Sequence, residues 1–428
     1  MGEELITPHL FYMQKETFIS TQEDINYWKS QQGFPGLGRP LRVTVALPNK
    51  GGCAYYRAIV PYTKLAELYP NVIEVRFTEN ILGINEEAAK RGIHEWIPNF
   101  DWADMDWADI VMTNNIANFG GQYTARICGK AKERGKIFHY DTDDLLTQLY
   151  KGHRLEKVYE NGLSDLTKFI YNHSDIVTVT QRKFQERVKE YMGKGILAVI
   201  KNAIDYNLPC WNATRSVIYK DKFVRVGWAG GIHHEEDVKE FAGIPNFVNQ
   251  RVGKEKVRWD FYGRPPIDPA VGPDWQQDVW KNYERIIMSG LKGGRNYTIN
   301  PALPTDQYGV MYSHMDMAIA PLQMNEFNDS KSEIKVAEAG RYSVPLIASN
   351  VGCYDETIIN GKTGFLVPHD APKSEWVNTL SKVLKDKDLR LEMGKNLNDV
   401  TEKFFNLNNV VHHRLILYKK FFDWKNKQ

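Results

Sequence analysis

The sequence predicts an α/β fold with two domains, each built on a parallel sheet covered by helices. The chain of 428 residues exceeds what one ordinary hydrophobic core supports, so two domains of roughly 200 residues each are expected. Short apolar runs alternate with helical patterns along most of the length, which is typical of parallel sheets. Two such domains imply a cleft between them, where we expect a ligand to bind.

The first sheet is expected in a domain over residues 41–205, after an irregular extension over residues 1–40. Its strands are predicted where short apolar segments are separated by polar or helical stretches. These segments are 41–47, 110–113, 136–140, 176–180 and 196–200.

A turn-rich stretch at residues 202–212 interrupts this alternation and marks the domain boundary. The second domain is expected over residues 206–400, and residues 401–428 are expected to form a C-terminal helix that packs across both domains. The predicted strands of the second sheet are 223–228, 257–262, 316–320, 346–348 and 364–367.

Composition and charge narrow the classes of protein to which the chain can belong, with respect to DNA binding, membrane insertion, secretion and metal binding by cysteines. Fifty-five basic and 53 acidic residues give a net charge of +2, so composition leaves DNA binding possible but not indicated. No apolar run approaches the roughly 20 residues that cross a bilayer, and the N-terminus does not resemble a secretory signal. We therefore expect a cytoplasmic protein. Four widely spaced cysteines show no zinc or redox motif.

Residues 320–349 carry the most informative pattern, which is strand, loop, helix, turn and strand. Ser330 followed by Glu333 is a capping box, which predicts a helix from about Lys331 to Gly340. Such a helix points free N–H groups and the positive end of its dipole toward the carboxyl edge of the sheet. A diphosphate is expected to bind at this end, with a charge from Lys331 and a hydroxyl from Ser332.

The spacing of Lys331, Lys335 and Glu338 places them on one face of that helix. The lysines are expected to face phosphate, while Glu338 accepts hydrogen bonds from a ribose diol. A solvated ladder of surface salt bridges is the alternative interpretation of the same spacing.

Several motifs in the second half of the chain occur in an order known from one enzyme family. They are Glu338-Ala339, Pro345-Leu-Ile-Ala348, Val351-Gly352, Glu356 and Gly361-Lys-Thr-Gly-Phe-Leu-Val367. In this order they resemble the GT-B glycosyltransferases, in particular the retaining group 1 or family 4 enzymes. The resemblance implies two Rossmann-like domains facing each other across a cleft, and a nucleotide-sugar donor, UDP- or GDP-linked, used without a metal or other cofactor.

The resemblance assigns ribose binding to Glu338, but the chain departs from the family at one position. Where the family has a first glutamate, eight residues before the second, this chain has Ser330. Asn328, Asp329 or the backbone of residues 330–332 is expected to replace that glutamate's contact with the donor sugar.

Further donor contacts are expected after the first two strands of the second domain. Gly230 and Gly231 follow the first of these strands, where glycine lets the backbone approach a phosphate closely. His233 or His234 is expected to contact the diphosphate. Arg264 is a further candidate, with an ordinary loop cation as its alternative.

In the first domain, a glycine-rich loop opens a helix after the first strand. It lacks the G-x-G-x-x-G spacing of a dinucleotide site, which argues against a dehydrogenase. By resemblance to GT-B enzymes, Gly51, Gly52, Tyr56 and Arg57 are candidates to contact the acceptor or the donor phosphate.

His139, Asp141, Asp143 and Asp144 end another apolar strand. We interpret the three aspartates as carboxylates that orient acceptor hydroxyls, or as a cap of the next helix, and His139 as a sugar contact. An Asp-x-Asp motif binds a metal in GT-A glycosyltransferases. The GT-B pattern downstream disfavours that interpretation here.

The predicted reaction moves a sugar from a nucleoside diphosphate to a hydroxyl acceptor, with retention of configuration. Two alternatives remain open. The first is a glycosyltransferase acting on hydroxymethylated bases in phage DNA, and the second is a non-catalytic protein that binds nucleotide sugars.

Overall fold

The chain divides into two compact units. Unit 1 comprises residues 1–203, Ser330–Ser332 and Leu407–Gln428, and unit 2 comprises Ile204–Asp329 and Glu333–Asn406. The structure is a computed structural model, and it describes residues 21–48, 50–78, 82–84, 87, 90, 96–98, 100–115, 121–153, 156, 162–214, 223–231, 233–265, 275–289 and 296–427.

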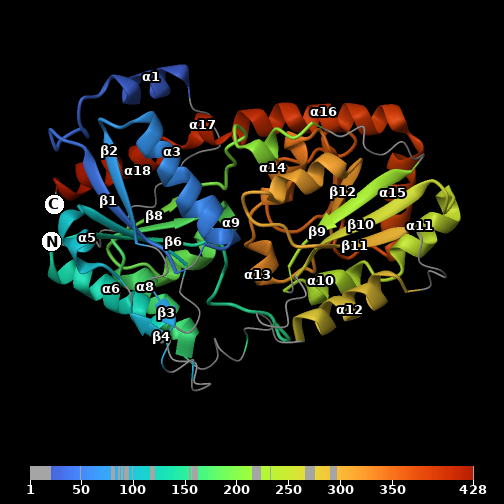
Figure 1. The fold of residues 1–428 in the computed structure, drawn as a ribbon, viewed down its shortest axis with the longest axis horizontal. Coiled ribbons are helices and arrows are strands. Elements are labelled where there is room, and N and C mark those ends of the chain that lie inside the picture. The colour runs from blue at the N-terminus through green and yellow to red at the C-terminus, as the bar shows by residue number, and fades with distance from the viewer. Residues whose placement is uncertain are drawn as a thin grey trace, which may run out of the picture. The chain divides into compact units, whose positions relative to one another are not determined.

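Unit 1 contains a six-stranded parallel sheet in the order β2-β1-β5-β6-β7-β8. Helices cover both faces, with α6 and α8 on one side and α3 on the other (Figure 1). The strands are β1 (Leu41–Ala46), β2 (Ile73–Thr78), β5 (Ile110–Asn114), β6 (Ile137–Asp141), β7 (Ile176–Val179) and β8 (Ile196–Val199), and a separate pair is formed by β3 (Leu82–Ile84) and β4 (Trp96–Pro98).

The helices of unit 1 come from both ends of the chain. Helices before residue 204 are α1 (Gln22–Ser30), α2 (Gly52–Ala54), the π-helix η2 (Tyr55–Ile59), α3 (Val60–Leu68), α5 (Trp102–Trp107), α6 (Gly121–Glu133), α8 (Ser164–His173), α9 (Arg182–Val188) and the 3-10 turn η4 (Lys189–Tyr191). The C-terminal α17 (Leu407–Val410) and α18 (His413–Lys425) complete the unit, and apolar side chains of α18 share one core with those of β1 and α3.

Unit 2 contains a second six-stranded parallel sheet, in the order β11-β10-β9-β12-β13-β14. One face is covered by α10, α11, α12 and α15, and α14 and α16 lie on the other (Figure 1). The strands are β9 (Val224–Ala229), β10 (Val257–Arg264), β11 (Tyr297–Pro301), β12 (Met317–Ala320), β13 (Leu346–Ser349) and β14 (Gly364–Val367).

The strands of unit 2 are also connected by helices and short helical turns. Its α-helices are α10 (Glu235–Glu240), α11 (Ile244–Val252), α12 (Trp275–Ile287), α13 (Glu326–Asp329), α14 (Ile334–Arg341), α15 (Lys373–Lys385) and α16 (Lys387–Phe404), and its 3-10 turns are η5 (Pro209–Trp211), η6 (Tyr308–His314) and η7 (Tyr354–Glu356).

The predicted fold class is confirmed, because both sheets are parallel and each carries helices. The predicted irregular extension is wrong for residues 22–30, which form α1, whereas residues 31–40 contain no helix or strand. Thr21 and Asp24 form a capping box at the start of α1, and Trp28 and Phe34 are buried in the core of unit 1. Residues 1–20 lie outside the described residues. Within the described part of the chain, no helix combines the length and apolar character needed to cross a membrane.

Candidate functional site

The strand order of unit 2 places a candidate site between β9 and β12. Strands β9, β10 and β11 follow one another outward in one direction, and the chain then returns to add β12 on the other side of β9. In open parallel sheets, ligands bind outside the carboxyl ends of the strands at this point of reversal. Gly230 and Gly231 follow β9, and the loop that leads to α13 follows β12.

The backbone after β9 is closely packed. A Cβ atom on Gly230 would lie 2.4 Å from the ring of Trp228, so only glycine fits there without rearrangement. Gly263, at a φ of +128°, brings the end of β10 against the Gly230 carbonyl oxygen. Lys335 of α14 donates to the carbonyl oxygen of Ala229. These contacts fix the strand end and give Lys335 a position at the carboxyl edge of the sheet.

The predicted start of the helix is wrong. Helix α14 begins at Ile334 rather than at Lys331, and Glu333 is its N-cap residue without a side-chain capping bond. Ser330 follows the short helix α13, and the Glu333 carboxylate accepts from the thiol of Cys353 instead of forming a capping box. Lys331 and Ser332 therefore lie in the segment before the helix. They do not lie in its first turn.

Glu338 lies on the buried side of α14. Its side chain is 3% exposed, and its carboxylate accepts a hydrogen bond of 2.7 Å from the hydroxyl of Tyr312 in η6. This burial excludes Glu338 from a solvated ladder of surface salt bridges. Tyr312 was missed by sequence reasoning, because no spacing rule connects η6 to α14.

A buried carboxylate connects the segments that follow β9 and β12. Asp237 of α10 binds His234 Nδ1 at 2.7 Å, and its other oxygen accepts from the Gln323 backbone and from Asn328 Nδ2, each at 2.8 Å. Asn328 Nδ2 also donates to the Gln323 carbonyl at 2.9 Å. Asn328 Nδ2 therefore makes its hydrogen bonds within unit 2. The prediction that Asn328 replaces the missing glutamate as a contact to the donor sugar is corrected for this nitrogen.

The remaining predicted donor residues of unit 2 differ in their surroundings. His233 is exposed, whereas the ring of His234 also contacts Trp228 edge-on, with centroids 5.9 Å apart. Arg264 is half-buried at the carboxyl end of β10. Among the residues that the structure describes, Arg264 has no side-chain ion pair.

Unit 1 has its own point of reversal, between β1 and β5. Gly51 and Gly52 follow β1 and open a helical run that continues through the π-helix η2 into α3. A π-helical turn re-aims side chains and is frequent at functional sites. Here it turns the Arg57 side chain inward, to 0% exposure, while Tyr56 stays half-buried.

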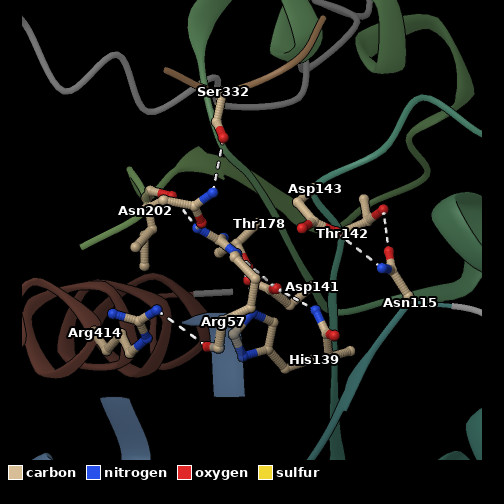
Figure 2. A network of polar contacts seen from close by, with 12 residues as sticks. Arg57, Asn115, His139, Asp141, Thr142, Asp143, Thr178, Asn202, Ser332 and Arg414 are labelled. Carbon is tan, nitrogen blue, oxygen red and sulfur yellow. Dashed lines mark hydrogen bonds and ion pairs between the residues drawn. The ribbon is translucent and has the colours of Figure 1, made fainter. Parts of the chain in front are cut away.

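Arg57 and Asp141 form a buried ion pair (Figure 2). The guanidinium binds both carboxylate oxygens, at 2.9 and 2.6 Å, and the same oxygens accept from Asn114 Nδ2 at 2.9 Å and Thr178 Oγ1 at 2.6 Å. Four hydrogen bonds saturate a carboxylate. Burial alone would raise the pKa of Asp141, but the Arg57 charge and these bonds hold it below its usual value.

His139 extends this network toward α18. Because Thr178 donates to Asp141, the His139 Nε2–H donates to Thr178 Oγ1 at 2.8 Å, which leaves Nδ1 to accept from the Tyr418 hydroxyl at 2.9 Å. Burial lowers the pKa of His139 to about 3, so the ring is neutral. Tyr418 in turn contacts the Tyr62 hydroxyl.

The predicted roles of Arg57, Asp141 and His139 as ligand contacts are therefore corrected. All three side chains are at most 2% exposed, and their polar groups are engaged within unit 1. The sequence predicted His139 and Asp141 at the end of a strand and Arg57 in the helical segment after the first strand, but it could not assign the direction in which each side chain points.

Asp143 and Asp144 differ from Asp141, because both are half-buried and lie near Cys53. Asn115, which has a positive φ of 55°, donates to Asp143 at 2.8 Å. Burial and the neighbouring charge of Asp144 raise the pKa of Asp143 to about 6. One ligand atom from each of Cys53, Asp143 and Asp144 lies within 4.8 Å of the others, a group that has the donor atoms to hold a cation.

We predict that Asp141→Asn destabilises the protein by about 3–5 kcal/mol, because it leaves the Arg57 charge buried without a counter-charge. Chemical denaturation measures the change in the free energy of unfolding. The control is Asp106→Asn, which breaks an exposed pair with Arg134 and should cost less than about 1 kcal/mol. Equal effects of the two substitutions would show that the buried pair is no more important than a surface one.

We also predict a pH-dependent effect of Asp143→Asn. The folded pKa of about 6 lies above the unfolded value of about 3.9, so the aspartate destabilises the fold increasingly as pH rises through this window. The variant should gain melting temperature relative to the wild type between pH 4 and pH 7. Asp165→Asn, at an exposed site of α8, is the control and should show no such trend. A constant difference for Asp143→Asn would contradict the raised pKa.

Comparisons with known proteins agree with this architecture. Residues 283–399 match the family model described as "Glycosyl transferases group 1". The D-inositol 3-phosphate glycosyltransferase of Paenarthrobacter aurescens (strain TC1) is 25% identical over 123 residues. The matched part is 26% of this chain and 30% of that protein, so the chain spans less than a third of this curated relative.

Solved structures are similar over most of the chain. Sucrose-phosphate synthase from Thermosynechococcus elongatus has a TM-score of 0.64 at 15% identity, over 90% of this chain and 99% of that one. Anabaena Alr3699/HepE in complex with UDP and glucose has a TM-score of 0.57 at 12% identity, over 89% and 100%. Both sheets thus agree with the GT-B fold of these solved structures, and residues 283–399 match the group 1 glycosyltransferase model.

Proposed function

We propose that this protein transfers a sugar from a nucleoside-diphosphate sugar to a hydroxyl acceptor. The observation that supports this most directly is the position of Lys335 and Glu338. Both lie on α14, inside the segment that matches the group 1 family, and Lys335 reaches the strand end at the point of reversal in unit 2. A cation and a carboxylate there suit a phosphate and a ribose diol.

The diphosphate is proposed to bind near the carboxyl end of β9. A Cβ on Gly231 would meet no atom within 4 Å, so this glycine, which follows Gly230, leaves room for a phosphate. Lys335, Arg264 and the N-terminus of α14 supply positive charge. Negative charge that develops on the departing diphosphate is stabilised by the same groups. We propose that this charge makes a metal ion unnecessary, and that configuration is retained.

The nucleotide is proposed to be UDP or GDP. UDP is favoured, because one similar structure, Anabaena Alr3699/HepE, was solved with UDP and glucose bound. Glu338, held by Tyr312, is proposed to accept from the ribose hydroxyls when the donor is bound.

The acceptor is proposed to bind in unit 1, next to the carboxyl ends of β1, β5 and β6. Asp143 and Asp144 are available to orient an acceptor hydroxyl, because neither is used by the Arg57–Asp141 pair. Gly51, Gly52 and Tyr56 border the same strand ends. A hydroxyl on the acceptor would lose its proton to the leaving phosphate, so no protein nucleophile is needed.

We predict that a single nucleoside diphosphate raises the melting temperature selectively. The screen compares UDP, GDP, ADP and CMP with their common sugar conjugates, with EDTA present to test metal independence. A ligand at about 100 times its Kd adds roughly 2.7 kcal/mol to the free energy of unfolding, which is several degrees for a chain of this size. The absence of any shift in folded protein would remove the donor proposal.

Glu338→Gln should weaken binding of that nucleotide about tenfold, because an amide accepts from a ribose diol less strongly than a carboxylate does. The substitution keeps the side-chain shape and an acceptor for Tyr312, so the melting temperature should change little. Isothermal titration calorimetry measures the affinity, and Glu375→Gln, at an exposed position of α15, is the matched control. Equal affinities of both variants would exclude Glu338 from the ribose site.

A further inference from the structure

His412 lies in unit 1, at the corner where α17 leads into α18. Its side chain is 0% exposed, and among the residues that the structure describes neither of its ring nitrogens has a hydrogen-bond partner. A buried polar group in this position has given up the hydrogen bonds that water would offer it. His413 lies beside it, with the centroids of the two rings 5.0 Å apart, and is 5% exposed. The corner therefore buries two imidazoles next to each other.

This corner disfavours positive charge. His412 is the N-cap residue of α18 and His413 is its first residue, so both lie at the positive end of the helix dipole. Burial lowers the pKa of His412 to about 4 and that of His413 to about 3. Charge on His412 and the charges of Arg414 and Lys420 also lower the pKa of His413, while the Asp24 carboxylate raises the pKa of both rings without offsetting burial. Both rings are therefore neutral at pH 7.

Helix α1 packs against this corner and is weakly anchored. Trp28 of α1 is buried in the same core cluster as Val411 and Leu415, which lie close to the two histidines in the chain. It is the buried residue of a helix of nine residues, and Asp24 in the first turn is half-buried. A helix of this length is marginal by itself, and few buried contacts give low local stability. We therefore expect α1 to open more easily than the rest of unit 1.

Helix α18 is anchored much more firmly than α1. Leu415, Leu417, Tyr418 and Phe421 are all buried, and Arg414 donates to the Arg57 carbonyl at 3.2 Å. The Tyr418 hydroxyl bonds to His139 at 2.9 Å. An opening at this corner should therefore displace α1 and leave α18 in place.

We propose that His412 and His413 form an acid-sensitive latch, which holds α1 against the C-terminal helices at neutral pH and releases it when the rings gain protons. A histidine exposed by opening has a pKa of about 6.5, above the values of about 4 and about 3 in the closed state. The open state therefore binds more protons in acid. The closed state has its full stability above about pH 6.5 and loses it as pH falls toward 4.

Hydrogen exchange of the full chain tests the latch in the wild type. Rates at pH 7 and pH 5, corrected for intrinsic exchange, give the opening constant of residues 25–30 in α1. This constant should rise about twentyfold between the two pH values for each histidine that opening exposes. Amides of β1 and β5 should keep their protection. No rise in α1, or an equal loss of protection in β1 and β5, would overturn the inference.

A substitution then assigns the effect to the latch. His412→Leu removes one titrating ring that makes no hydrogen bond with the described residues, so the change between pH 7 and pH 5 should become about twentyfold smaller than in the wild type. His412→Gln, which cannot titrate either, should give the same result. His369→Leu, at an exposed position of unit 2, is the control and should leave the change as it is. A wild-type pH dependence in both His412 variants would overturn the inference.

Discussion

The buried ion pair between Arg57 and Asp141 is the interaction on which unit 1 depends. Removing two charges from water is costly, and the attraction between them compensates only when the remaining donors and acceptors are also satisfied. Here Asp141 receives bonds from β5 and β7, through Asn114 and Thr178, and Arg57 reaches the end of β8 through Ile200. One salt bridge thus connects the helix after β1 with the carboxyl ends of four other strands, where the acceptor is proposed to bind.

The same constraint explains why the C-terminal helix belongs to unit 1. Arg414 of α18 is buried, donates to the Arg57 carbonyl at 3.2 Å and lies over the ring of Tyr62. Tyr418 supplies the hydroxyl that donates to His139 Nδ1. Burial lowers the pKa of Arg414, and the nearby charge of Arg57 lowers it further. Two buried cations lie near one carboxylate, and α18 adds to the surrounding hydrogen bonds through Arg414 and Tyr418.

In unit 2, a single buried carboxylate, that of Asp237, connects segments that follow two different strands. Asp237 binds His234, the N-cap residue of α10, and the segment after β12, through Gln323 and Asn328. The bonds connect the two strand ends that border the point of reversal. This leaves Lys335 and Glu338, which approach from α14, as the charged groups best placed for a ligand. In both units, therefore, a buried aspartate connects the ends of strands through hydrogen bonds.

The sequence by itself determined the fold class, the central strands and the family segment, because buried parallel strands are continuous apolar runs. It missed the edge strands β2 and β11, whose polar residues reflect their partial exposure. It also identified the helix near α14. Of the residues labelled in Figure 2, it identified Arg57, His139, Asp141, Asp143 and Ser332, but it missed their partners, which are Asn115, Thr178, Asn202 and Arg414. At the end of β6, Asp141 pairs with Arg57, whereas the half-buried Asp143 accepts from Asn115. Only the tertiary structure decided this, because the deciding contacts join residues far apart in the chain.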